Sequence, residues 1–228
     1  MGIADHNSIV CESLTKEYFI RRQTIKVLSG IDLTIEGNEM VVLKGRSGSG
    51  KTTLLHLMSG LIRPTSGKVS IGNLCVSELS NQELSLLLLN QIGFIFQNFN
   101  LLPTYTIYEN IEVALAPKRH HEKETEKIIK PLLEEFGLTD KAAMLPAELS
   151  IGQQQKVAIV RTIAKKPSVV FADEPTGSVD PETADEIIQN LIKLRKEKGS
   201  TIIIATHGSF PEEHADRTLI LENGFIKL

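Results

Sequence analysis

The sequence predicts an α/β fold with a parallel sheet, an N-terminal antiparallel β subdomain and an inserted helical subdomain. Continuous apolar runs at 169–172 and 201–206 are typical of central strands in a parallel sheet that is covered on both faces. We expect a helix after each run, from 181 to about 198 in the first case, and this alternation indicates an α/β fold. Between about 98 and 165 the sequence favours helices without strong strands, which indicates the insertion.

The N-terminal elements follow in order. Apolar runs at 9–11 and 31–35 look like strands of an antiparallel sheet. The run at 40–43 predicts a buried strand, and the apolar residues of 54–58 predict a helix that Gly60 closes. A strand and a helix therefore flank the glycine-rich segment between them.

Three further helices are expected. The leucine-rich segment 84–89 is far too short to span a bilayer; we interpret it as a buried helix face, with membrane or partner contact as the alternative. Segment 122–136 has apolar residues at helical spacing beneath a charged face, which we expect to be solvated. A helix that begins near residue 150 places Val157, Val160 and Ala164 on one face.

Length and composition limit the possible functions. The 228 residues suit a single domain, with a core of about 1–97 and 166–228 and a helical subdomain of about 98–165. The net charge of −3 and the pI near 6.1 argue against a nucleic-acid partner. Two distant cysteines predict no disulfide framework, which fits a reducing cytoplasm. Neither a membrane span nor a signal pattern is expected.

A glycine-rich loop between the predicted strand and helix matches the phosphate-binding pattern G-x-x-x-x-G-K-[ST]. Its glycines allow backbone N–H groups to point at phosphate oxygens, and the following helix N-terminus adds a positive dipole end. Lys51 is placed to reach the outer phosphates, and the Thr52 hydroxyl to hold Mg²⁺. The alternative, a turn with a surface lysine, explains neither spacing nor flanks. The sequence thus predicts a P-loop NTPase core that binds nucleotide through Gly45, Arg46, Ser47, Gly48, Ser49, Gly50, Lys51, Thr52 and Thr53.

Two carboxylates end the apolar strand at 169–172. At the carboxyl end of a parallel strand beside a phosphate loop, Asp173 can hold Mg²⁺ through its water shell. Glu174 can orient and deprotonate an attacking water. The alternative is a pair of acids at a strand end before Pro175.

Helix starts carry the remaining polar candidates. Ser150 and Gln153 fit a capping box, and a capped N-terminus with a serine hydroxyl is also an anion site. Asp180 before Pro181 fits a helix N-cap. Of the six histidines, His207 is the one that directly follows a predicted buried strand.

The order of these motifs resembles the ATP-binding cassette (ABC) family over nearly the whole chain, from about 8 to 228. The order is the phosphate loop, Gln97, the signature-like segment 149–153, the acid pair, Asp180 and His207. Segments 97–103 and 172–177 are most similar to the subfamily of lipoprotein-releasing and MacB-like export systems. The resemblance implies an ATPase subunit of a transporter.

The resemblance also assigns roles within one subunit. It implies that Tyr18 stacks on adenine and that Gln97 touches Mg²⁺ and couples the site to a membrane subunit. It implies that Glu174 is the general base and that His207 contacts the terminal phosphate. The cofactors implied are ATP and Mg²⁺.

Other roles are implied across a dimer. Ser150, Gly152 and Gln153 would act on the ATP held by the other subunit, with Asp180 at the same junction. Two ATP molecules would thus be sandwiched in a homodimer or a paired cassette.

The chain departs from the family pattern at three positions: Ile151 replaces the usual Gly, Lys156 the usual Arg, and Gly208 the usual acid after the histidine. These departures bear on the trans contacts and on hydrolysis.

We therefore predict an ATP-hydrolysing subunit that drives a separate integral membrane permease, for export or extrusion, from the cytoplasmic face of the cell membrane. One alternative is a soluble ABC-type ATPase in translation or DNA repair. Another is a nucleotide-gated regulatory module with weak hydrolysis, which the substitutions at Ile151 and Gly208 favour.

Overall fold

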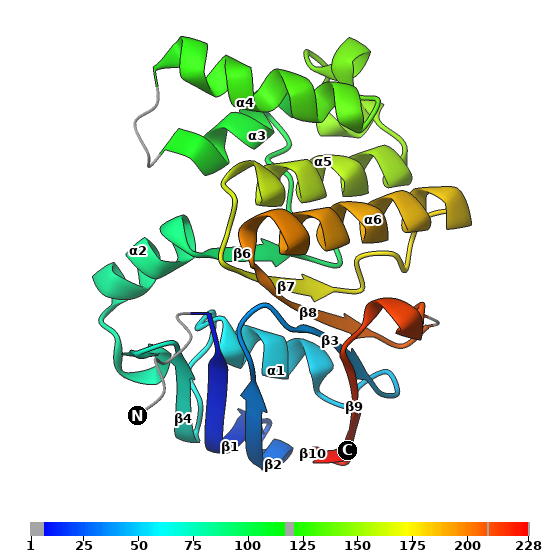
Figure 1. Cartoon of the computed structure of the whole chain (residues 1–228). Helices are drawn as coiled ribbons and strands as arrows, with labels where there is room; N and C mark the ends of the chain where they lie inside the picture. The colour runs from blue at the N-terminus through cyan, green and yellow to red at the C-terminus, as the bar shows by residue number, and fades with distance from the viewer. Residues whose placement is uncertain (1–6, 117–120, 209, 228) are drawn as a thin grey trace.

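The chain folds into two β-sheets and a stack of helices (Figure 1) in a computed structural model that describes residues 7–116, 121–208 and 210–227. One sheet lies at one end of the molecule, α3 and α4 lie at the other, and the second sheet reaches the middle between them (Figure 1). This arrangement confirms the predicted fold class.

The first sheet is antiparallel, with strand order β2-β1-β4-β5. Its strands are β1 Ile9–Ile20, β2 Gln23–Ile35, β4 Ser66–Ile71 and β5 Leu74–Cys75. β1 and β2 are longer than the sequence predicted, and they pair as far as Ile20 and Gln23. β4 pairs with β1 only as far as Thr15. Residues 16–26 therefore form a two-stranded ribbon beyond the four-stranded part.

The second sheet has the order β10-β9-β3-β8-β7-β6, and all its pairs are parallel except β10 with β9. Its strands are β3 Met40–Lys44, β6 Ile92–Ile95, β7 Val169–Asp173, β8 Thr201–Thr206, β9 Arg217–Glu222 and β10 Phe225–Lys227. Every residue of β7 and β8 is buried. The continuous apolar runs arise because helices or the first sheet cover both faces.

Six α-helices complete the described chain: α1 Lys51–Met58, α2 Asn81–Asn90, α3 Ile107–Leu115, α4 Glu122–Glu135, α5 Ile151–Ala164 and α6 Pro181–Lys198. Among the residues that the structure describes, four short 3₁₀ turns lie at Val76–Glu78, Thr139–Lys141, Pro146–Glu148 and Glu212–His214. Where the structure describes the chain between β6 and β7, it contains helices and turns and no strand. α4 and α3 stack over α5, and α5 lies beside α6 (Figure 1).

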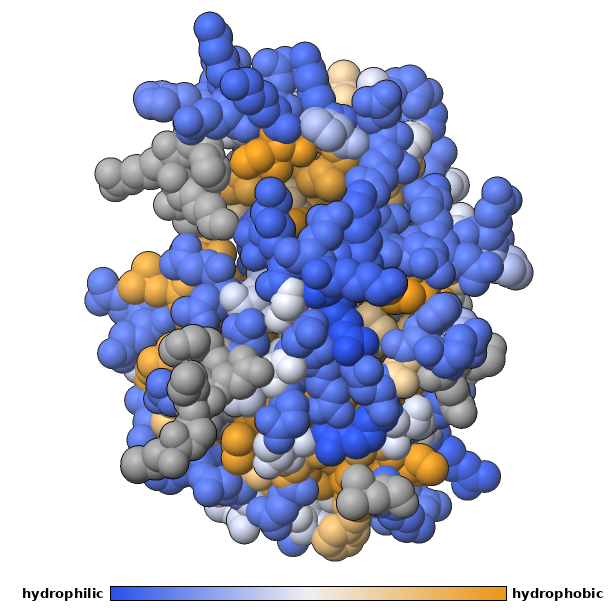
Figure 2. Space-filling view, in the orientation of Figure 1, coloured by the Kyte–Doolittle hydropathy of each residue, from blue (hydrophilic) through white to orange (hydrophobic). Residues whose placement is uncertain are grey.

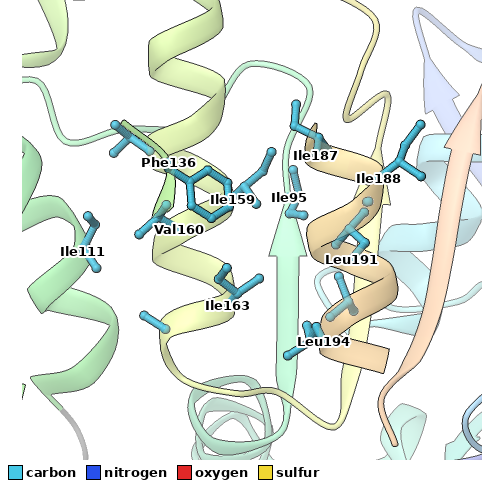
Figure 3. Packing of buried hydrophobic residues seen from close by; sticks show 14 of the residues in the cluster. Ile95, Ile111, Phe136, Ile159, Val160, Ile163, Ile187, Ile188, Leu191 and Leu194 are labelled. Atoms are coloured by element: carbon cyan, nitrogen blue, oxygen red, sulfur yellow. The ribbon is translucent and has the colours of Figure 1, made fainter. Parts of the chain in front are cut away.

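Two hydrophobic clusters form the core, one on each face of the second sheet. Successive residues of β7 alternate between them, with Val170 in one cluster and Phe171 in the other, as the period of two in a strand requires. Figure 3 shows the first cluster, in which Val160 and Ile163 of α5 and Leu191 of α6 gather around the strand that carries Ile95. The helical segment and the sheet therefore share one core.

The expected helix after β8 is a wrong prediction. Among the described residues, only the 3₁₀ turn Glu212–His214 separates β8 from β9. This connection contains Gly208 and Pro211 and has no apolar period of helical length, so it cannot form an amphipathic helix.

The expected burial of 84–89 is confirmed for one helix face only. These residues lie in α2, where Leu87 alone is buried, whereas Leu86 is 54% and Leu89 39% exposed. Leu84 and Leu88 are partly buried and pack with Leu87 against the second cluster, so one face of α2 meets the core. Partner contact is the better explanation only for the exposed Leu86 and Leu89. Within the described ranges, no helix is both long and apolar enough to cross a bilayer.

Candidate active site

Three parallel strands bring most of the candidate residues to one edge of the second sheet. β3, β8 and β7 are neighbours, and their carboxyl ends lead into the glycine-rich loop, His207 and Glu174. A cleft of about 330 Å³ opens at this edge. It is lined by Val27, Ser47, Gly48, Gly50, Lys51, Thr52, Thr53, Gln97, Glu174 and His207.

The loop backbone forms an anion cradle. Gly48 and Gly50 have φ values of 77° and 102°, which residues other than glycine rarely adopt. Gly50 is the N-cap of α1, and no side chain caps this helix. The first intrahelical bond of this turn runs from Leu54 N to Gly50 O at 2.9 Å. The N–H groups of the first turn, together with the helix dipole, therefore face the cleft as donors for phosphate.

Gly45 lies where the loop passes closest to the sheet. A Cβ atom at this position would come within 2.5 Å of Leu221 O and 2.7 Å of Ser49 Oγ. Glycine is thus required at this position because a side chain would collide with neighbouring atoms, and not because of the φ angle.

Lys51 is only 7% exposed, and its ammonium donates to Gly45 O at 2.9 Å and to Arg46 O at 3.2 Å. The buried cation is therefore held inside the loop by carbonyl oxygens. Phosphate oxygens are stronger partners for an ammonium than neutral carbonyls, so an incoming polyphosphate can replace them.

Thr52 and Asp173 supply the oxygens for a cation. Thr52 Oγ1 donates to Asp173 Oδ2 at 2.7 Å. Burial raises the pKa of Asp173, the neighbouring Glu174 raises it further, and the bond from Thr52 opposes both effects. A hard divalent cation suits this pair, because Mg²⁺ prefers hydroxyl, carboxylate and phosphate oxygens and its charge would favour the ionised carboxylate.

Glu174 is held above the cleft by the last residue of β8 and by the residue after it. His207 Nδ1 lies 2.7 Å from Glu174 Oε1, and Thr206 Oγ1 donates to Glu174 Oε2 at 3.2 Å. Glu174 has a φ of 49°, and such strained backbone often occurs at functional sites. The carboxylate is mostly buried at 9% exposure, whereas His207 is 60% exposed.

The remaining polar candidates form a second constellation, at a separate hollow of about 490 Å³ lined by Ser150, Ile151, Gly152, Gln153, Lys156, Ser178, Val179, Asp180 and Thr183. Ser150 and Gln153 make the predicted capping box, and Asp180 accepts from Thr183 N at 2.9 Å as the predicted N-cap. These backbone and hydroxyl donors lower the pKa of Asp180. None of these residues lines the first cleft, so a single chain does not bring the two sets together.

Ile151 begins α5 with helical backbone and is 58% exposed. This residue therefore does not adopt the positive φ that glycine allows. Its exposed side chain lines the hollow beside Ser150 and Gly152.

Of Tyr18 and Gln97, only Gln97 lies at the first cleft. Gln97 lines the first cleft, whereas Tyr18 lies on the β1–β2 ribbon outside that lining. The ammonium of Lys16 lies 5.0 Å from the centre of the Tyr18 ring. Sequence reasoning missed this lysine and also Val27, which contacts the loop where a Cβ on Gly50 would meet Val27 Cγ1 at 2.9 Å.

The loop after Gln97 is clamped to α5. Arg161 donates to Phe99 O and to Asn100 O, each at 2.7 Å. Both acceptor residues have positive φ, 59° and 49°, and burial lowers the pKa of Arg161. The guanidinium thus fixes a strained loop to the helix that starts at Ser150.

Comparison with known proteins gives one consistent result. Residues 28–177 match the family model described as ABC transporter. The chain is 40% identical over 207 residues to the ABC transporter ATP-binding protein YtrE of Bacillus subtilis, covering 91% of this chain and 90% of YtrE. It is 37% identical over 216 residues to the lipoprotein-releasing system ATP-binding protein LolD of Legionella pneumophila, covering 95% of each.

A solved structure agrees along the whole fold. The dimeric post-hydrolysis structure of the ATP-binding cassette MJ0796, bound to ADP and Pi, superposes with a TM-score of 0.92 at 35% identity and covers 96% of this chain and 97% of that one. MJ0796 comes from Methanocaldococcus jannaschii. The phosphate loop, the acid pair and these matches lead to one conclusion: the chain belongs to the ABC transporter family, as an ATP-binding subunit.

Proposed function

We propose that this protein hydrolyses Mg-ATP as a dimer and drives a separate membrane subunit from the cytoplasmic face. The observation that supports this most is the meeting of Lys51, the Thr52–Asp173 pair and Glu174 at one cleft. Thr52 and Asp173 would hold Mg²⁺, which supplies charge neutralisation for the β- and γ-phosphates.

Glu174 acts as the general base. Its carboxylate takes a proton from the water that attacks the γ-phosphorus, the bond to the β–γ bridging oxygen breaks, and ADP and phosphate leave. Thr206 and His207 orient the carboxylate through the two contacts described above. His207 is exposed enough to turn toward the terminal phosphate.

Nucleotide closes the dimer in this proposal. Ser150, Gly152 and Asp180 lie at a hollow apart from the cleft. They can therefore contact only an ATP that is held in the cleft of the opposing subunit. The capped start of α5 offers a hydroxyl, N–H groups and the positive end of the helix dipole to that phosphate. The dimeric MJ0796 cassette with ADP and Pi supports this arrangement.

The membrane subunit docks beside α2. Figure 2 shows apolar side chains at the surface over α2, where Leu86 and Leu89 are exposed. A neighbouring groove of about 310 Å³ has a mainly apolar lining. That lining includes Asn100 and Arg161, so the groove adjoins the loop that carries Gln97. Displacement of this loop would couple the nucleotide to the partner.

Glu174→Gln tests the proposal. This change keeps size and hydrogen bonding but removes basicity, so we expect a loss of turnover of about a hundredfold or more with ATP still bound. Size-exclusion chromatography in Mg-ATP should then show a stable dimer. The matched control Glu134→Gln changes an exposed acid of α4 and should behave like the wild type. Near wild-type hydrolysis by Glu174→Gln would mean that another group is the base.

Wild-type turnover separates this proposal from the regulatory alternative. A wild-type protein that binds Mg-ATP and dimerises without measurable phosphate release would favour the nucleotide-gated module. Copurification from native membranes would identify the transmembrane subunit, and its absence would favour the soluble ATPase.

A further inference from the structure

The aromatic ring of Tyr18 has one face covered by a fixed cation. Lys16 and Tyr18 are two residues apart on β1, and the Lys16 ammonium lies 5.0 Å from the ring centre. This distance is within the range of a cation–π contact. A flat ligand could then stack only on the opposite face of the ring.

The cation itself is anchored. Lys16 Nζ donates to Arg63 O at 2.7 Å. Arg63 is fixed in turn, because its guanidinium donates to Val76 O and Ser77 O at 2.9 Å each, and also to Leu79 O. The ammonium therefore has a defined position between a rigid carbonyl and the ring.

The ring needs such an anchor because of where it lies. β1 loses its β4 partner after Thr15, and an isolated two-stranded ribbon is only marginally stable. The segment after α1 ties down the start of this ribbon, with Thr65 N donating to Thr15 O at 3.0 Å and Glu17 N donating to Thr65 Oγ1 at 2.9 Å. Lys16 extends this attachment from the backbone to the Tyr18 side chain.

We propose that Lys16 is a positioning residue for purine stacking: it holds the Tyr18 ring in the orientation that receives the base. This inference rests on the proposed role of Tyr18 as the stacking platform. Lys16 acts through the ring and touches neither phosphate nor base. It also links the platform to α1, whose first residue is the phosphate-loop lysine, through the segment that carries Arg63.

The test compares ligands with and without a base. Dissociation constants for ATP and for inorganic tripolyphosphate, both with Mg²⁺, would be measured by calorimetry for the wild type and Lys16→Met. Loss of one cation–π contact predicts ATP binding about two- to fivefold weaker, with tripolyphosphate binding unchanged. Lys16→Arg should retain wild-type affinity, because a guanidinium also stacks on an aromatic face.

Two further variants complete the design. Lys26→Met removes the same charge from the exposed partner strand of the ribbon and should leave both affinities unchanged. In a Tyr18→Ala background, Lys16→Met should cause no further loss of ATP affinity, because its effect passes through the ring. Thermal unfolding checks that each variant is folded.

The outcomes distinguish the inference from the proposed function. If Tyr18→Ala weakens ATP binding while Lys16→Met does not, Lys16 has no positioning role. Equal weakening of ATP and tripolyphosphate by Lys16→Met would show a general charge effect and overturn the inference. If Tyr18→Ala leaves ATP binding unchanged, the proposed stacking role of Tyr18 is wrong, and the role of Lys16 is wrong with it.

Discussion

Gly45→Ala should disable the phosphate loop through one steric contact. The new Cβ would lie 2.5 Å from Leu221 O, whereas ordinary van der Waals contact begins at 3.4 Å. Leu221 belongs to β9, which is paired with β3 on one side and β10 on the other. The carbonyl cannot yield cheaply, so the loop must move instead.

The expected cost follows from this overlap. Overpacking a tight site typically costs about 1–3 kcal/mol. For a protein of this size, each kcal/mol lowers the melting temperature by about 2–4 °C, so we expect a decrease of about 2–12 °C. Gly45 O is also an acceptor for Lys51. Displacing it misplaces the lysine, and ATP binding should weaken by about tenfold or more.

Thermal unfolding by circular dichroism and ATP titration would measure the two effects. Gly152→Ala is the matched control, because its Cβ would meet only Val179 Cγ1 at 3.9 Å. Alanine also favours a helix by up to about 1 kcal/mol over glycine, so this control should melt at or above the wild-type temperature. A Gly45→Ala protein that melts and binds ATP like the wild type would refute the steric argument.

Three other changes are predicted. Because burial raises the pKa of Asp173 above its ordinary 3.8, its contribution to stability is greatest at low pH and is lost as pH rises through the raised pKa. Asp173→Asn should therefore gain stability over the wild type between pH 4 and 7.5 in urea unfolding, yet lose Mg²⁺-dependent hydrolysis; a gain that shrinks with pH would contradict this. Gly152→Asp should abolish hydrolysis while the affinity of the monomer for ATP stays unchanged, because the new carboxylate would repel the γ-phosphate held by the opposing subunit. An active Gly152→Asp enzyme would show that residue 152 does not contact that phosphate. Gln97→Ala should reduce partner-stimulated hydrolysis more than ATP affinity, and equal losses would make Gln97 a plain ligand.

Much of the first cleft was predictable from sequence because local signals and chain order agree there. The glycine-rich loop follows a buried strand, and Asp173 and Glu174 end another. Parallel strands bring such termini to the same edge. The caps at Ser150 and Asp180 were predictable for a similar reason, since a capping side chain acts within one turn of its own helix.

The missed features depend on contacts between distant segments. Val27 of β2 lies against Gly50, which is distant from it in the sequence, and no local pattern marks this contact. The same holds for Lys16, whose anchor is a backbone carbonyl 47 positions away. In α2 the sequence predicted the face that packs on the core, but it could not say whether this chain or another protein covers Leu86 and Leu89.

The clamp made by Arg161 has a consequence for how two nucleotides would influence one another. It fastens the loop after Gln97, which lies beside the subunit's own cleft, to α5, whose first turn would serve the opposing cleft. In a closed dimer, movement at either nucleotide would therefore be carried to the other, and the two occupancies would be thermodynamically linked. Removing the guanidinium would weaken this link, and the dependence of hydrolysis on ATP concentration would become less sigmoidal.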